Sequence, residues 1–361
     1  MTNKKDFAEL LKGCRPVKDD NGNVIVQTIM NMQVVCLTTD DEYSLDNRFE
    51  NPLKSLVARN HSYGQLTFTN NAGKDVIIPT QMAVMTKQRA QNHGMVKAGY
   101  IPKKSQRTYH DAGCVEGSQP GYITDTDEYR FIPVTMREML FNAVGNTQGH
   151  SNIYPAIVSL GNKTNAQTDT YLDRYFSKYD KKLEQFIAHF ERPDKFIGII
   201  VLIDDEIVAI DKFPSFTYAE QVWEMMIRDC YGSMAVMSEI NNKKTKKYFT
   251  DVFNKEMKEG VDVLDVLASS LQKTKEKITK NVVEKIEDLM DFEFNMRTDP
   301  DSHEVVKSFI LECDGYVGQL ISESDYNHLV SIVRKESFNP NAMRRVNEMK
   351  RKARSQNRFT L

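Results

Sequence analysis

The chain has 361 residues, of which 40% are hydrophobic and 9% aromatic, so it can bury a sizeable core and is not an intrinsically disordered protein. Lysine and arginine total 48, aspartate and glutamate 50, and the formal net charge of −2 argues against a surface built entirely for nucleic acid. The longest apolar run, residues 197–203, is far shorter than the roughly 20 residues of a membrane-spanning helix. No apolar signal segment opens the chain. We expect a cytoplasmic protein, in the host cytoplasm or in a virion if a phage encodes it, with no membrane contact.

The five cysteines are scattered, and no CxxC pair or Cys/His cluster with zinc-ligand spacing is present. This pattern is typical of individual reduced thiols and disfavours a disulfide framework or a structural zinc site. The acidic residues around the turn at 204–206 are typical of a solvated hairpin turn. The sequence therefore predicts no metal site and no cofactor.

The N-terminal half is expected to be β-rich. Residues 1–52 are weakly patterned and are predicted to form an arm or extra strands. From 53 to 132 the hydrophobic period is two, with Leu66 and Phe68 on one face of a strand and a turn at 70–75 before the next strand. This spacing predicts a sandwich-like fold or a strongly bent sheet.

Helices and a hairpin follow. Apolar residues recur at three- and four-residue steps from Tyr171 to Phe190 and predict one amphipathic helix. Residues 197–203 predict a buried strand whose hairpin partner is 207–210. Together, residues 53–240 are expected to form one α+β domain.

The composition changes after Ile240, and residues 241–340 are predicted to be an α-helical C-terminal extension, including one or two helices over 302–338. A near-heptad stripe within 261–297 is expected to contact partner helices or a second copy of the chain. The members of this stripe are Leu264, Leu267, Leu271, Ile278, Val282, Ile286 and Leu289. Residues 341–361 form a basic tail expected to contact nucleic acid or an acidic surface, or to be a solvated helix.

The densest polar cluster, residues 87–94, is predicted to be a loop that binds a ligand. Lysine and arginine suit phosphate or carboxylate, and amide side chains suit a base or ribose edge. The alternative is a solvated turn. The candidate ligand-binding residues in this loop are Lys87, Gln88, Arg89, Asn92 and His93.

A second polar segment contributes Arg107, Cys114 and Glu116 to the candidate site. In an extended chain Cys114 and Glu116 share a face, where the carboxylate raises the thiol pKa and disfavours a nucleophile. His110 is roughly 13 Å from Cys114 along a strand, so a Cys/His dyad would need a distant partner such as His93. A buried, hydrogen-bonded cysteine is the alternative.

Common catalytic signatures are missing from the sequence. It contains neither GxxxxGK[ST] nor GxGxxG, and neither GxSxG nor HExxH. The sequence therefore lends no support to a P-loop ATPase, a Rossmann enzyme, a simple serine hydrolase or a zincin.

In their order along the chain, three blocks and two flanking helices over about residues 55–237 resemble the ARPP domain, the ARG and rhodanese-phosphatase-superfamily-associated protein domain. The blocks are Lys87-Gln88-Arg89 with Asn92, then Cys114-Val115-Glu116, then residues 198–203 followed by Asp211-Lys212-Phe213. The sequence departs from the family pattern after Glu116, where Gly117-Ser118-Gln119 replaces a Gly-Arg-Trp-like ending. The resemblance implies gene neighbourhoods with ADP-ribosylglycohydrolases and phosphatase-like proteins, and hence a role around ADP-ribose, NAD-derived molecules or bacterial conflict. It supplies no catalytic mechanism.

Three hypotheses follow. The first is an accessory protein that binds an ADP-ribose- or NAD-derived nucleotide in a bacterial or phage conflict setting. The second is a structural or assembly protein of a phage or mobile element, oligomeric and without enzymatic activity. The third is an enzyme that uses Cys114 or Glu116 with His93 to hydrolyse a glycosidic or phosphoester bond. Whether the chain is an enzyme stays open, with the balance against it.

Overall fold

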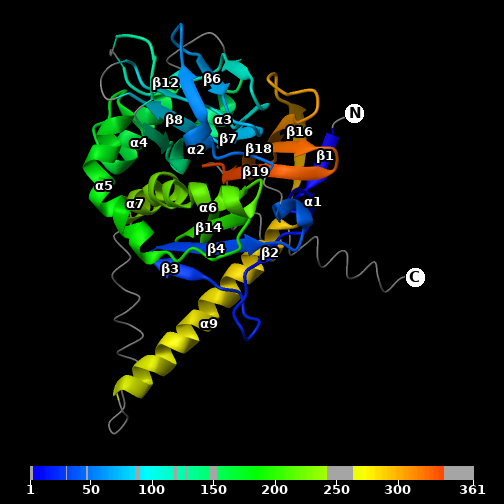
Figure 1. The fold of residues 1–361 in the computed structure, drawn as a ribbon. Coiled ribbons are helices and arrows are strands. Elements are labelled where there is room, and N and C mark those ends of the chain that lie inside the picture. Colours follow the sequence, from blue (N-terminus) through cyan, green and yellow to red (C-terminus); the bar gives the residue numbers. More distant parts are fainter. Residues whose placement is uncertain are drawn as a thin grey trace.

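The computed structural model describes residues 3–29, 31–45, 48–86, 90–117, 120–126, 128–145, 153–241 and 263–336 (Figure 1). Its largest element is a ten-stranded antiparallel sheet with the order β1-β16-β17-β18-β19-β15-β14-β4-β2, in which β3 also pairs with β4. The strands that open the chain are β1 (Asn3–Asp6), β2 (Arg15–Pro16), β3 (Gln27–Ile29) and β4 (Met32–Thr38). The central hairpin is β14 (Gly198–Ile203) with β15 (Glu206–Lys212). The last four strands are β16 (Glu293–Thr298), β17 (Lys307–Glu312), β18 (Tyr316–Glu323) and β19 (Tyr326–Arg334).

The central strand β14 is buried on both faces, which explains its uninterrupted apolar sequence. Ile199 and Val201 point into the larger hydrophobic core, together with Phe186 and Trp223 from the helices. Ile200 and Leu202 point into a second core on the opposite face. The sheet therefore separates two cores.

Helices cover both faces of this sheet (Figure 1). The larger core receives α3 (Arg137–Asn142), α4 (Tyr154–Thr164), α5 (Leu172–His189), α6 (Phe216–Met225) and α7 (Gly232–Asn241), with a π-helical segment at Met226–Tyr231 between the last two. The second core is closed by α1 (Phe7–Leu10) and by the C-terminal half of α9 (Val263–Leu289), which buries Val282, Ile286 and Leu289. The short helix α2 (Pro52–Ser55) and 3₁₀ turns at Glu42–Leu45 and Val134–Met136 complete the described helical elements.

Residues 56–131 form three small antiparallel sheets, where the sequence predicted one sandwich or bent sheet. One joins β5 (Leu56–Arg59), β6 (Leu66–Asn70) and β11 (Gln106–Tyr109), and another joins β7 (Val76–Ile78) and β10 (Gly99–Ile101). The third contains β8 (Met82–Met85), β9 (His93–Gly94), β12 (Gly113–Cys114) and β13 (Glu128–Phe131). These strands are only two to five residues long, and they are divided among separate small sheets.

The predicted α+β class, the helix over 171–190 and the hairpin after residue 197 are confirmed. The predicted helical extension over 241–340 is wrong for residues 293–334, which form β16 to β19 of the large sheet. Turns at Asp314-Gly315 and Ser324-Asp325 separate β17, β18 and β19. Because β18 and β19 are buried on both faces, neither helical periodicity nor clean alternation describes them. The large sheet also crosses the domain boundaries predicted at residues 52 and 240. The basic tail over 341–361 lies outside the described residues.

Candidate functional site

His93 and Cys114 are direct cross-strand partners in the β9–β12 pair. Antiparallel pairing places opposite side chains close together, and Cys114 Sγ lies 3.3 Å from His93 Nε2. Both side chains are fully buried. The structure therefore supplies the distant histidine that a Cys/His pair required, and His110 plays no part in this contact.

The hydrogen bonds around His93 assign its tautomer. Nδ1 lies 2.7 Å from the carbonyl oxygen of Gln91, which only accepts, so Nδ1 carries the proton. Nε2 is then the acceptor that faces Cys114, the Asn60 amide at 3.4 Å and the backbone N–H of Gly64 at 3.4 Å. The ring of Tyr63 stacks parallel to the imidazole with 6.4 Å between centroids. The imidazole is thus held in one orientation by contacts at both ring nitrogens and by the ring stacked beside it.

The Gln91 side chain links Cys114 to Glu116 and Tyr154 through hydrogen bonds. Its Oε1 accepts from Cys114 Sγ at 3.0 Å, and its Nε2 donates to the backbone oxygen of Glu116 at 2.6 Å and to the Tyr154 hydroxyl at 3.2 Å. Tyr154 begins α4 and also lines a surface hollow of about 730 Å³ along that helix, with Pro155 and Val158. The cluster therefore reaches the surface through Tyr154.

Burial raises the pKa of the Cys114 thiol to about 12. The thiolate, which is the nucleophilic form of cysteine, is therefore rare at neutral pH. Cys114 has the geometry of a Cys/His dyad and the ionisation of a structural thiol, and here it acts as a hydrogen-bond donor.

The carboxylate of Glu116 is incompletely hydrogen-bonded within the described structure. Its side chain is only 7% exposed, and Oε2 is buried without a hydrogen-bond partner. Burial raises the pKa of Glu116, the charge of Asp173 raises it further, and the backbone amide of Asn92 lowers it. Asp173, in the first turn of α5, also has a buried oxygen without a partner, Oδ1. Two under-satisfied carboxylates thus lie near each other, held by the isolated bridge that joins Glu116 to Tyr171.

The Asn92 side chain stabilises the loop between β8 and β9. Its Oδ1 accepts from the backbone N–H of Thr86 at 2.8 Å and from the Thr86 hydroxyl at 3.2 Å, which closes the loop between β8 and β9. The remaining candidates of this loop, Lys87, Gln88 and Arg89, lie outside the described residues. Asn92, His93, Cys114 and Glu116 therefore share one region of the structure.

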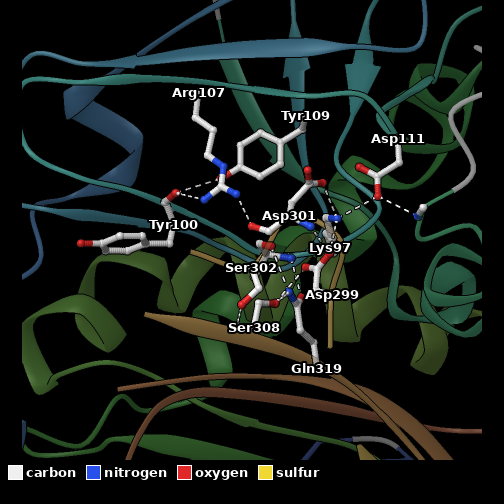
Figure 2. Close-up of polar contacts among 12 residues, drawn as sticks. Lys97, Tyr100, Arg107, Tyr109, Asp111, Asp299, Asp301, Ser302, Ser308 and Gln319 are labelled. Atoms are coloured by element: carbon white, nitrogen blue, oxygen red, sulfur yellow. Dashed lines mark hydrogen bonds and ion pairs between the residues drawn. The ribbon is translucent and has the colours of Figure 1, made fainter. Parts of the chain in front are cut away.

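Arg107 belongs to another cluster (Figure 2). Its guanidinium donates to the backbone oxygens of Tyr100, at 3.3 Å, and of Asp301. Beside it the buried ammonium of Lys97 forms ion pairs at 2.9, 2.7 and 2.7 Å with three carboxylates, those of Asp111, Asp299 and Asp301. The structure thus separates Arg107 from the His93 region and gives it a role in joining the small sheets to the large one.

Sequence reasoning missed Tyr154 and Asp173 as members of the His93 region. Neither stands in a motif, and each lies at the start of a helix, Tyr154 beside Gln91 and Asp173 near Glu116. Gln91 was visible as one polar residue of the loop, but only the strand register shows that it bonds to Cys114. Among the residues that the structure describes, no group of three or more His, Cys, Asp or Glu side chains is arranged to hold a metal ion.

Within the described part of the chain, no helix combines the length and apolarity needed to cross a membrane. No curated protein and no solved structure matches the chain. The family model described as the ARG and Rhodanese-Phosphatase-superfamily-associated Protein domain matches residues 24–296, which extends the resemblance well beyond residues 55–237 on both sides. The match takes in the loop of 87–94, Cys114, Glu116, α5, the β14–β15 hairpin and α9. The chain belongs to this family.

Proposed function

We propose that the protein is an accessory binding protein for a ribose-containing nucleotide of the ADP-ribose or NAD-derived kind. The observation that carries the proposal is the buried Glu116 oxygen without a hydrogen-bond partner. Buried polar groups are normally paired, and an unpaired one in a native structure calls for an explanation such as a ligand. A ligand that brings hydroxyl groups supplies the missing donors.

The chemistry of the surrounding residues suits such a ligand. An acidic side chain that accepts hydrogen bonds from ribose hydroxyls is a recurring feature of nucleotide sites. Asp173 offers a second acceptor close by, so the pair matches the two neighbouring hydroxyls of a ribose. The surface hollow beside α4, lined by Tyr154, Pro155 and Val158, offers an apolar and aromatic wall for a base. The family resemblance implies the same class of ligand.

The test is a thermal-shift and calorimetric titration of the full chain with ADP-ribose, NAD, linear and cyclic nucleotides. Binding to the folded state raises the midpoint temperature of unfolding. When the ligand is at a hundred times its Kd, the free energy of unfolding increases by about 2.7 kcal/mol. In Glu116→Gln one acceptor oxygen is replaced by a donor group. The apparent affinity for the nucleotide should therefore fall by at least about tenfold, the cost of one lost charged hydrogen bond, and the thermal shift should be smaller.

The matched control is Asp169→Asn, which removes one negative charge just before the start of α5, the helix that carries Asp173. The Asp169 side chain is 73% exposed and pairs with Arg174, so this variant should bind the nucleotide as the wild type does. Absence of any shift with millimolar nucleotide in the wild type would refute the proposal.

The second candidate is an assembly role, and the course of α9 favours it. Its C-terminal half packs on the chain itself, whereas Figure 1 shows its N-terminal part extending beyond the rest of the described molecule. We propose that this projecting part of the 261–297 segment contacts partner helices or a second copy. Sedimentation of the wild type beside Leu264→Ser/Leu267→Ser would test this. A monomeric wild type whose sedimentation is unchanged by these substitutions would exclude self-assembly through α9.

A further inference from the structure

Lys212, at the end of β15, is as buried as Lys97 but has none of its counter-charges. The Lys212 side chain is 2% exposed and Lys97 is not exposed at all. Lys97 is surrounded by three carboxylates. Lys212 Nζ donates a hydrogen bond to the backbone oxygen of Asn327 and lies 4.5 Å above the ring centroid of Tyr326. It forms no ion pair with a carboxylate of the described residues, although the charge of Asp41, which lines the same cavity, acts on it.

The two lysines also differ in what lies beside them. Lys212 lines a cavity of about 550 Å³, the size of a small-molecule site, whereas Lys97 is fully buried among its three carboxylates. The cavity is walled by Phe49, Tyr326 and His328 and reaches the surface at Lys12, Ser324 and Asp325. None of its lining residues belongs to the His93 region. A buried amine that lines a cavity and has no ion pair to hold its charge is in a position to react with a ligand in that cavity.

We propose that this cavity is a binding site for a small aldehyde or ketone, with Lys212 as the amine that forms an imine with the carbonyl carbon. The nitrogen lone pair forms the new C–N bond while the carbonyl π electrons move to oxygen, which takes a proton and gives a carbinolamine. Loss of a proton from nitrogen and of the protonated hydroxyl as water then forms the C=N bond. No oxidant or reductant is needed.

The titration behaviour of the cavity supports this chemistry. Burial lowers the pKa of Lys212 to about 8, against smaller opposite effects of Cys14 and Asp41. At pH 7 about 10% of such an amine is neutral, roughly 200 times the neutral fraction of an ordinary lysine. Desolvation of a lysine is a recognised way of activating its amine as a nucleophile.

Two titratable side chains, His328 and Glu323, lie close together in the wall of this cavity. His328 Nε2 lies 3.5 Å from Glu323 Oε2, and both residues line the cavity. Burial, together with the charges of Arg48 and Lys212, lowers the pKa of His328 to about 4 against the opposite effect of Glu323, so the imidazole is uncharged at neutral pH. Arg48 is itself paired with Glu323 and Asp75.

The test uses propanal with sodium cyanoborohydride at pH 7 on the full chain, followed by peptide mass spectrometry. Cyanoborohydride reduces an imine to a stable secondary amine, so the adduct marks the reactive lysine. We expect Lys212 to be alkylated at least about tenfold faster than exposed lysines. The expected factor is smaller than the ratio of neutral fractions because the reagents reach a buried amine more slowly than an exposed one. Lys97 should stay unmodified.

Two comparisons complete the test. In urea the preference for Lys212 should disappear, because unfolding restores the ordinary pKa of its amine, and this comparison needs no variant. Lys212→Met should lose the preferred adduct, whereas Lys285→Met, in the partly exposed pair with Glu206, should keep it. Labelling of Lys212 in the folded wild type at or below the rate of exposed lysines would overturn the proposal.

Discussion

Lys97 Nζ lies 2.7 Å from Asp299 Oδ1, although 202 residues separate them in the sequence. The contact joins the β-rich half of the chain to the strand that follows α9 (Figure 2). Next to it, Gln319 of β18 accepts from the backbone N–H of Ala98 at 2.7 Å and donates to its backbone oxygen at 3.0 Å. The C-terminal strands are therefore bound into the same body as the small sheets.

Substituting Lys97 should destabilise the fold strongly. Lys97→Met leaves the carboxylates of Asp111, Asp299 and Asp301 together without their shared cation, and breaking a buried ion pair in this way costs about 3–5 kcal/mol. Denaturant unfolding measures the change. In Lys285→Met, which breaks a partly exposed pair with Glu206, the loss should stay within about 1 kcal/mol. Equal losses in the two variants would contradict this role of Lys97.

A second prediction concerns the close approach of β18 and β19. A Cβ at Gly318 would lie 2.3 Å from the backbone oxygen of Ser331 and 3.0 Å from the Cα of Ile332, so the two strands would have to separate. Gly318→Ala should therefore cost about 1–3 kcal/mol, as overpacking does. Gly73→Ala meets no atom within 4 Å and should be within about 0.5 kcal/mol of the wild type. Thermal and urea unfolding of both variants would decide.

Local patterns predicted the elements that have one buried face or a clear turn. The stripe of α5 and the acidic turn between β14 and β15 were both readable, and Asp204 and Asp205 adopt the positive φ that a tight hairpin needs. β18 and β19 were not readable in this way, because burial on both faces removes the alternation that marks a strand. Their place in the large sheet is set by the pairing of β19 with β15, a contact between distant segments.

The candidate site shows the same division. The residue types of the 87–94 loop and of Cys114 to Glu116 marked the region, and the sequence even required a distant histidine for Cys114. It could not show that His93 is that histidine, because this depends on the register of β9 against β12. The contacts of Arg107 could not be predicted for a related reason, since its partner Asp301 comes from a turn near the far end of the chain.

Alkylation should spare Cys114 in the folded protein. With its thiol pKa raised to about 12 by burial, only about one molecule in ten thousand carries the thiolate at pH 8. Iodoacetamide at pH 8 should therefore leave Cys114 unmodified in the native protein and modify it fully in urea. Rapid native alkylation of Cys114 would instead support the hypothesis of a Cys114–His93 nucleophile.

Glu116 should make the unliganded fold less stable as the pH rises. Its pKa is raised in the folded state, so the folded state favours the protonated form, and the associated stability is lost as the pH rises from the unfolded pKa of about 4.3 through the folded value. Glu116→Gln, which cannot ionise, should therefore gain stability relative to the wild type between pH 4.5 and pH 8. Urea unfolding across this range measures the difference, and Asp169→Asn should stay within about 1 kcal/mol of the wild type at each pH. A Glu116→Gln variant that loses stability relative to the wild type as the pH rises would mean that the carboxylate is held by contacts within the fold, and the argument for a ligand at this oxygen would fail with it.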